Sequence, residues 1–138
     1  MRLLVDTNVF LDYLLGRESG CKEALQFFIW CRHNKNPIYV TSMSLRDIEY
    51  IAMKNLHNKK EANVLLGDVY SICSKVVGIS ADSAISSIYE DYKDFEDELL
   101  IQTAREELLD AIVTNNKKDF VDRGFPVFTP REIVQLAS

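Results

Sequence analysis

The sequence predicts an α/β domain built on a parallel sheet with helices on both faces. Short apolar runs of strand length recur along the chain, such as Leu3-Leu4-Val5, Ile38-Tyr39-Val40 and Ala111-Ile112-Val113. Between them lie longer segments whose apolar residues recur at helical spacing. Strands that alternate with helices are typical of a parallel sheet covered on both faces. Because no repeat, low-complexity stretch or linker interrupts the 138 residues, we expect one domain over residues 1–138.

The first half of the chain is expected to contain strands and helices bounded by residues that start or stop helices. Asp6 or Thr7 can cap the first helix, and Gly16 can end it. Asn36-Pro37 breaks the second helix. In chain order, the expected elements are a strand at residues 2–6, a helix at Thr7–Leu15, a helix at residues 20–34, a strand at Ile38–Thr41, a helix capped by Ser42 or Ser44 that runs to about Asn55, and a helix at Lys60–Ser74.

The second half continues the same alternation. Ser80 or Asp82 can cap one helix and Asp94 the next, while Pro130 lies in the first turn of the last helix, where proline is favoured. In chain order, the expected elements are a strand at Val76–Ile79, a helix that runs to about Tyr92, a helix after Asp94 that carries Leu99 to Leu108, a strand at Ala111–Thr114, a short helix at Lys117–Val121, an edge strand at Pro126–Phe128 and a helix at Pro130–Leu136.

Charge and composition argue against two classes of protein. The net charge of −5 is unlike that of a generic nucleic-acid binder, and no apolar run approaches the ~18 residues of a membrane span. Only Arg2 and a short apolar stretch precede Asp6, which argues against a signal peptide. The three cysteines form no metal-binding pattern, and Cys21 and Cys31 share one expected helix, too far apart to bridge. We therefore expect a cytoplasmic protein with reduced thiols and no membrane partner.

Four aspartates are the main functional signal, because each lies where the fold would bring it to one edge of the sheet. Asp6 ends the first apolar run, Asp47 follows the second, Asp97 opens a long amphipathic segment and Asp119 follows Ala111–Val113. The carboxyl ends of parallel strands meet at one edge, where ligands bind. A carboxylate cluster repels itself and is usually tolerated because a cation sits in it. Oxygen ligands of this kind suit Mg²⁺ or Mn²⁺.

Each acid also has an ordinary structural explanation. Asp6 and Asp94 are good helix caps, and Asp97 lies in a first turn that favours acids. Asp47 could be a solvated helix acid. Glu49, two residues on, faces another side of the helix, so only one of the two can serve the site. Taken together, however, these acids lie at the same expected edge of one sheet, which favours a shared site.

At these residues the sequence resembles a PIN-domain ribonuclease of the kind that acts as the toxin of a toxin–antitoxin pair. Four segments carry the resemblance, in order and over nearly the whole chain: Leu4-Val5-Asp6-Thr7-Asn8-Val9-Phe10-Leu11-Asp12, Val40-Thr41-Ser42 leading to Asp47-Ile48, Asp94-Phe95-Glu96-Asp97, and Val113-Thr114-Asn115-Asn116-Lys117-Lys118-Asp119-Phe120. The resemblance implies a three-layer α/β/α sandwich, a Mg²⁺- or Mn²⁺-dependent ribonuclease activity, an antitoxin partner and a homodimer. It carries over Asp6, Asp47, Asp97 and Asp119 as metal-site acids.

Two positions depart from the family pattern. The second acid is commonly Glu, whereas Asp47 is one methylene shorter, so Glu49 remains an alternative. Asn116 stands where many members have an acid, and it offers an oxygen without a negative charge. Asn8 and Thr114 are expected to fix the orientation of the carboxylates. RNA beyond the cleaved bond could follow a basic patch that consists of Lys54, His57, Lys59 and Lys60.

Two other functions stay open on the sequence alone. Asp6 could be the nucleophile of a phosphatase or phosphotransferase, although such enzymes want a second acid two residues on, where this chain has Asn8. The chain could instead be an inert binding module. A partner surface is suggested by Phe27-Phe28-Ile29-Trp30, because four successive helical residues span all sides of a helix. We expect at least one of these aromatics at a surface or interface, where a homodimer or an antitoxin could bind.

Overall fold

Five parallel strands form the sheet in the part of the chain that the structure describes, residues 1–90, 94–120 and 123–136 of a computed structural model. The strand order is β3-β2-β1-β4-β5, so the first strand is central and its neighbours come from distant parts of the chain. Val5 is paired with Val113, which brings the ends of β1 and β4 together. The strands are β1 (Leu3–Val5), β2 (Ile38–Thr41), β3 (Lys75–Val77), β4 (Ala111–Val113) and β5 (Val127–Phe128).

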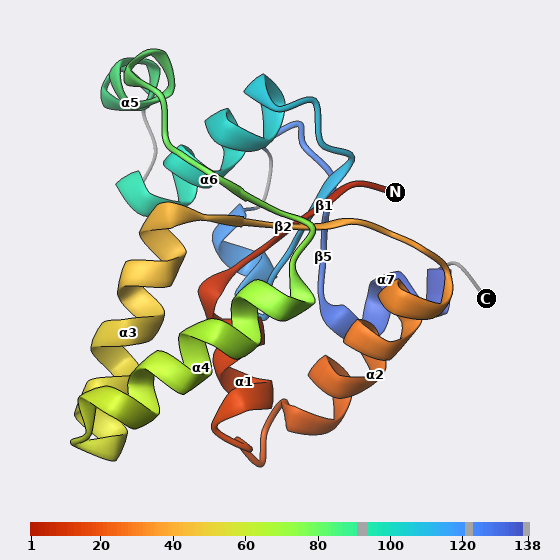
Figure 1. Cartoon of the computed structure of the whole chain (residues 1–138). Helices are drawn as coiled ribbons and strands as arrows, with labels where there is room; N and C mark the ends of the chain where they lie inside the picture. Colours follow the sequence, from red (N-terminus) through yellow and green to blue (C-terminus); the bar gives the residue numbers. More distant parts are fainter. Residues whose placement is uncertain (91–93, 121–122, 137–138) are drawn as a thin grey trace.

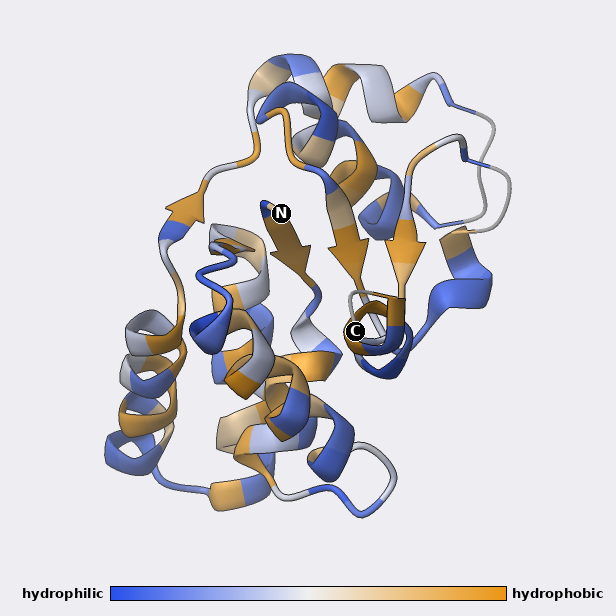
Figure 2. Cartoon of the chain, turned by 90° about the vertical axis from the view of Figure 1, so that its right-hand side faces the viewer, coloured by the Kyte–Doolittle hydropathy of each residue, from blue (hydrophilic) through white to orange (hydrophobic). Residues whose placement is uncertain are grey.

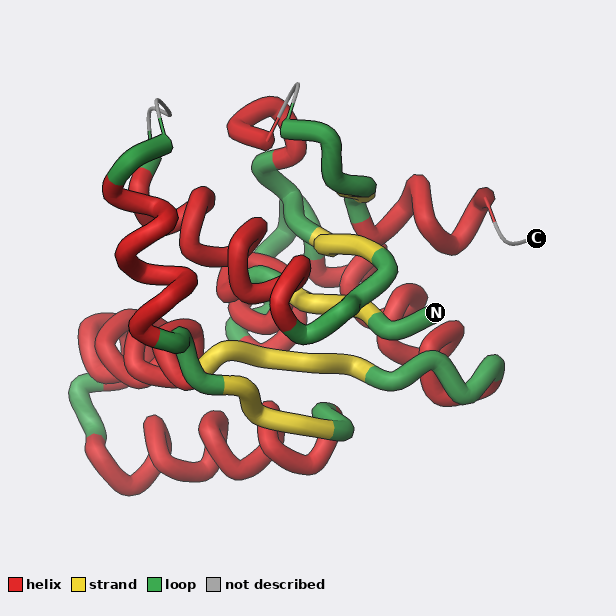
Figure 3. Tube along the Cα trace, turned by 90° about the horizontal axis from the view of Figure 1, so that it is seen from above, coloured by secondary structure: helices red, strands yellow, loops and turns green. Residues whose placement is uncertain are grey.

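Helices cover both faces of this sheet, as Figure 1 and the view from above in Figure 3 show. The α5–α6 pair covers one face, and the remaining α-helices pack on the other. This arrangement confirms the expected α/β/α sandwich with a parallel sheet. The helices are α1 (Thr7–Leu14), α2 (Cys21–His33), α3 (Ser42–Leu56), α4 (Lys59–Ile72), α5 (Ala81–Ile88), α6 (Phe95–Glu106) and α7 (Pro130–Leu136), with a 3₁₀ turn η1 (Lys117–Phe120).

Alternation along the central strand divides the core into two parts. Leu3 and Val5 point to the face covered by α1, α2, α3, α4 and α7, whereas Leu4 points to the face covered by α6. All three side chains are fully buried, and the apolar colouring of the strands in Figure 2 reflects this burial on both faces. No helix of the described residues is both long and apolar enough to cross a membrane. The core therefore packs against both faces of the sheet and holds the carboxyl ends of its strands in place.

Helix caps place the acids at that edge. Asp6 caps α1 and Asp94 caps α6, as expected. The cap of α3 is Thr41, however, and not Ser42 or Ser44. Thr41 keeps the extended backbone of β2, and its Oγ1 accepts a hydrogen bond from the Ser44 amide at 3.0 Å. Ser42 is already the first residue of the helix.

Other boundaries differ from the expected ones by one to a few residues. The third strand lies at Lys75–Val77, because Val77 pairs with Thr41 at the end of β2. Ser80, not Asp82, caps α5, which ends at Ile88, and α6 ends at Glu106, before Leu108. Tyr92 and Val121, the expected ends of two helices, lie outside the described residues.

The aromatic run in α2 is more buried than expected. Phe27 and Phe28 are buried in the core, and Trp30 is half-buried against it. The exposed member of the run is the aliphatic Ile29, which is 59% exposed. Cys21 and Cys31 do share α2, and neither forms a disulfide.

The cap of α3 gives a prediction about stability. In Thr41→Val the buried Ser44 amide loses its acceptor, so we expect the free energy of unfolding to fall by about 1–2 kcal/mol. Thr103→Val is the matched control. Thr103 is also fully buried, but among the described residues its hydroxyl has no hydrogen-bond partner. Chemical denaturation should show little or no loss for Thr103→Val, and equal losses for both variants would contradict the role of the Thr41 cap.

Candidate active site

The strand order creates a crevice at the carboxyl ends of β1 and β4. From β1 the chain continues to β2 on one side, whereas β4 lies on the other side, and ligands of parallel sheets bind at such a switch point. A pocket of about 380 Å³ opens here between α1, α3 and α6. Six carboxylates line it: Asp6, Asp47, Asp94, Glu96, Asp97 and Asp119. The structure thus brings together all four aspartates singled out in the sequence.

Asp6 is the most firmly held of these acids. Its Oδ1 accepts a hydrogen bond from the Thr7 amide at 2.8 Å, which is the helix cap. Its Oδ2 accepts from Thr114 Oγ1 at 2.8 Å and from Asn8 Nδ2 at 3.3 Å. Since Val5 pairs with Val113, the next residues of the two strands are adjacent. Asn8 and Thr114 therefore orient the carboxylate, in the positions expected from the sequence.

The second acid of the pocket is Asp47 and not Glu49. Asp47 lies in α3, is half-buried and lines the pocket. Glu49 points elsewhere, because its Oε1 accepts a hydrogen bond from Lys59 Nζ at 3.0 Å, at the start of α4. Asp47 also has a neighbouring cation, with Arg46 Nη1 at 3.6 Å from its Oδ1. The geometry favours Asp47 over Glu49 for a role in the pocket.

The first turn of α6 contributes three acids. Asp94 caps the helix by accepting from the amides of Glu96 and Asp97, at 2.9 and 3.4 Å. The sequence assigned Asp94 only to this cap and left Glu96 without a role, yet both line the pocket. Asp119 comes from η1 and is exposed. Asp94 can cap α6 and line the pocket at the same time, since only its Oδ1 accepts the cap hydrogen bonds.

Three of these acids, Asp6, Glu96 and Asp97, have raised pKa values, chiefly because they are buried and also because other acids lie nearby. Burial raises the pKa of Asp97 from 3.8 to about 7, with further contributions from Asp94, Asp6, Asp119 and Glu96. Burial also raises the pKa of Asp6, against the lowering effect of the Thr114 and Thr7 hydrogen bonds, and Asp47 adds to the rise. The pKa of Glu96 is raised by burial and then by Asp47. The pocket is therefore short of positive charge.

The donor set fits a hard divalent cation, although no enclosed site is formed by the protein alone. Over residues 1–90, 94–120 and 123–136, no three acidic, histidine or cysteine side chains are arranged as a ready metal site. Mg²⁺ commonly uses one or two carboxylates and keeps several waters, so it does not need such a cage. Burial is the main cause of the raised pKa values of Asp97 and Asp6, and neighbouring acids add to it, so a bound cation would favour the ionised form of both. The residues present fit Mg²⁺ or Mn²⁺ on these grounds.

The other predicted site residues divide into two groups. Asn116 lines the pocket, and its backbone amide donates a hydrogen bond to Thr114 Oγ1 at 3.1 Å. The basic patch lies elsewhere, at the end of α3 and the start of α4. None of its members, Lys54, His57, Lys59 and Lys60, lines the acid pocket. The structure therefore does not bring this patch to the acids.

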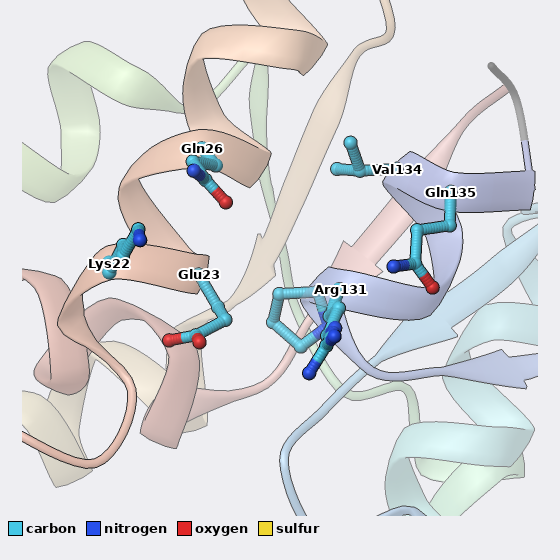
Figure 4. A pocket seen from close by; sticks show the side chains of 7 residues that line it. Lys22, Glu23, Gln26, Arg131, Val134 and Gln135 are labelled. Carbon is cyan, nitrogen blue, oxygen red and sulfur yellow. The ribbon is translucent and has the colours of Figure 1, made fainter.

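Two other hollows lack an acid cluster among the residues described for them. Figure 4 shows one between α2 and α7, where Glu23 is the single carboxylate beside Lys22 and Arg131. The other is a groove of about 790 Å³ beside α2, lined by apolar, neutral polar and basic side chains. Neither offers the oxygen ligands of the pocket at the strand ends.

Asp97 gives a prediction for the metal-free protein. Its folded-state pKa is about 7, above the usual value of 3.8, so the folded chain holds a proton between these pH values that the unfolded chain has lost. Stability should therefore fall as the pH rises through that range. Asp97→Asn removes this penalty, and we expect its thermal midpoint in EDTA to exceed that of the wild type by a few degrees at pH 8.

The difference should shrink toward zero as the pH falls to about 4. Asp68→Asn, an exposed aspartate of α4, is the control and should match the wild type at every pH. A thermal midpoint for Asp97→Asn that is lower than the wild type at pH 8 would contradict the repulsion inferred for the cluster.

Comparison with solved structures supports the fold. A toxin–antitoxin complex from Klebsiella pneumoniae matches with a TM-score of 0.65 and 23% identity, over 93% of this chain and 97% of that one. VapBC2 from Rickettsia felis, bound to a DNA fragment from its promoter, gives 0.71 and 19%, over 93% and 97%. Mycobacterium tuberculosis VapC20, a sarcin-ricin loop cleaving toxin, gives 0.67 and 15%, over 89% and 95%.

The sequence of the chain also matches the model of a known family. No curated protein matches the chain in sequence. The family model described as PIN domain, however, matches residues 2–118, a range that holds β1 to β4 and three of the four aspartates, with Asp119 as the next residue. The chain belongs to the PIN domain family.

Proposed function

We propose that this chain is a metal-dependent endoribonuclease of the cytosol that acts as the toxin of a toxin–antitoxin pair. The observation that carries the proposal is the cluster of six carboxylates at the switch point of a PIN domain sheet, in which Asp6 and Asp97 have raised pKa values. The structures of similar fold include a toxin–antitoxin complex and a sarcin-ricin loop cleaving toxin. The free cysteines are consistent with a reducing compartment.

Asp6, Asp47, Asp97 and Asp119 are the residues that would hold Mg²⁺ or Mn²⁺ in this proposal. When bound, such a cation activates a water for attack on the phosphodiester and offsets negative charge on the phosphate. The protein contributes orientation. Thr114 and Asn8 fix the Asp6 carboxylate by hydrogen bonds, while the Thr41 and Asp94 caps fix the helices that carry Asp47 and Asp97. Asn116 adds a neutral amide to the wall of the pocket.

The phosphatase alternative fits the site less well. A phosphatase of this kind wants a second acid two residues after its nucleophile, to exchange a proton with the leaving group. Here that position is Asn8, an amide that cannot serve as an acid or base, and its Nδ2 donates to Asp6 Oδ2 at 3.3 Å. The residue beside Asp6 therefore supports the ribonuclease proposal over the phosphatase alternative.

Cleavage of RNA tests the proposal directly. The purified chain should cleave single-stranded RNA with Mg²⁺ or Mn²⁺, and excess EDTA should stop it. Asp97→Asn should lower the rate by about a hundredfold or more, because a metal supplies several kcal/mol of transition-state stabilisation and 1.36 kcal/mol is tenfold in rate. Gel analysis of a labelled RNA measures both effects.

The second acid supplies the matched control. Asp47→Asn should be strongly impaired, whereas Glu49→Gln should retain near-normal activity, because Glu49 pairs with Lys59 outside the pocket. Cleavage that persists in EDTA would overturn the metal mechanism. The absence of cleavage under all metal conditions would favour the inert binding module.

A protein partner has a candidate surface beside α2. The groove there includes the exposed Leu25 and Ile29, one helical turn apart, next to the buried Phe28. Exposed apolar side chains beside an open groove are typical of protein interaction sites. We assign this groove to an antitoxin, since similar folds have been solved in toxin–antitoxin complexes. A homodimer remains a separate prediction.

The exposed isoleucine of this groove makes the partner testable. Tagged wild-type chain should capture a small protein from its own cells, and Ile29→Glu should lose at least most of it, because a charge would be buried on binding. Ile85→Glu, a change at a similarly exposed isoleucine of α5, should retain the partner. Capture that is unchanged in Ile29→Glu would contradict the assignment. Ultracentrifugation of the same variants would show whether the surface mediates self-association instead.

A further inference from the structure

One cation lines the active-site pocket, in addition to Arg46, which contacts Asp47 but is not among the described lining residues. Arg17 follows α1 and lines the pocket together with Asp6 and Asp97. Of the described residues that line this pocket, it is the one with a positive charge. Its side chain is 39% exposed, so a ligand in the pocket can reach the guanidinium.

Arg17 is held by a carboxylate outside the pocket. Asp12, in α1, is only 6% exposed, and its Oδ1 accepts from Arg17 Nη1 at 3.5 Å. The backbone is fixed as well, because the Arg17 amide donates to the Asp12 carbonyl at 3.0 Å and the Arg17 carbonyl accepts from Cys21 at 2.8 Å. Gly20 makes room for this arrangement, since a Cβ there would lie 2.3 Å from Asp12 Oδ2. The turn between α1 and α2 therefore presents Arg17 in a defined place.

A chain of hydrogen bonds connects this turn to the metal-site acids. Asn115 Nδ2 donates to the other oxygen of Asp12. The Asn115 amide donates to Asn8 Oδ1 at 3.2 Å, and Asn8 Nδ2 donates to Asp6 Oδ2. Asp12, Asn115 and Asn8 thus link the turn that carries Arg17 to the Asp6 carboxylate.

The guanidinium keeps donors for a ligand. Asp12 is its side-chain partner within the described residues, and the contact uses Nη1 alone. Nε and Nη2 are left, and a guanidinium presents these donors in the planar fork that matches phosphate oxygens. Asp12 therefore neutralises only part of the Arg17 charge.

We propose that Arg17 binds a phosphate of the RNA next to the one that is cleaved. This assignment rests on the proposed ribonuclease function and names the residue that holds the polyanion beside the acids. It explains how an acidic pocket can retain RNA away from the metal itself. Asp12 acts as a positioning residue for Arg17.

Salt dependence of RNA binding tests the assignment. The Asp97→Asn chain serves as the non-cleaving parent, and its affinity for a short fluorescein-labelled single-stranded RNA is measured by anisotropy at fixed Mg²⁺ over a range of KCl concentrations. Adding Arg17→Gln keeps a donor for Asp12 but removes the charge. We expect binding to weaken about tenfold, and the slope of log K against log salt to fall by up to about 0.7, the value for one phosphate contact on a single strand.

Two further variants separate this role from a structural one. Arg17→Lys keeps the charge and should keep the slope, while binding more weakly than the parent because the planar fork is lost. Lys75→Ala, at an exposed cation of β3 paired with Glu107, should match the parent in affinity and slope. Thermal unfolding confirms that each variant is folded.

The outcomes distinguish this assignment from the proposed function. A reduced slope for Arg17→Gln alone supports it. If Arg17→Gln matches Lys75→Ala, or loses affinity with an unchanged slope, the phosphate contact is overturned while the ribonuclease proposal stands. If neither the parent nor the wild type binds RNA, the proposed function fails and the assignment fails with it.

Discussion

Repulsion among six carboxylates at one edge of the sheet is the constraint on which the functional region depends. The acids come from the end of β1, from α3, from α6 with its cap, and from η1, so no local structure could keep them together. The β1–β4 pairing does this for Asp6, because it sets Thr114 beside it as a hydrogen-bond donor. Repulsion adds to burial, the main cause, in raising the pKa of Asp97 to about 7. The clustered carboxylates lower the stability of the folded chain, and a cation bound among them would offset this loss.

Helix caps reduce this cost by giving two of the acids a second role. Asp6 caps α1 and Asp94 caps α6, so each carboxylate accepts backbone hydrogen bonds while it faces the pocket. The positive ends of the helices also favour negative charge there. For Asp6 and Asp94, capping a helix and lining the pocket are therefore compatible in one arrangement. An acid that directly precedes a helix at this edge of the sheet can do both.

The sequence predicts most of what local chemistry determines. The caps at Asp6 and Asp94 and the strand–helix alternation follow from residue type and spacing. The choice of Thr41 over Ser42 or Ser44 does not, because all three hydroxyls are suitable caps and the end of β2 decides among them. The sequence also could not decide between Asp47 and Glu49 as the second acid, since Lys59, the partner that holds Glu49, belongs to the next helix. Ile29 shows that an unbroken apolar run does not reveal which member faces outward.

Arg17 could not be recognised from the sequence because what makes it distinctive lies far along the chain. Its partner Asp12 is fixed by Asn115, which is 103 positions away, and by the absence of a side chain at Gly20. Asn115 in turn holds Asn8, which holds Asp6. A motif of acids predicts where a cation could sit, but it does not predict which basic side chain the fold places beside them. In this chain, whose net charge is −5, the fold brings Arg17 to the wall of the acidic pocket, and the proposed phosphate contact depends on that placement.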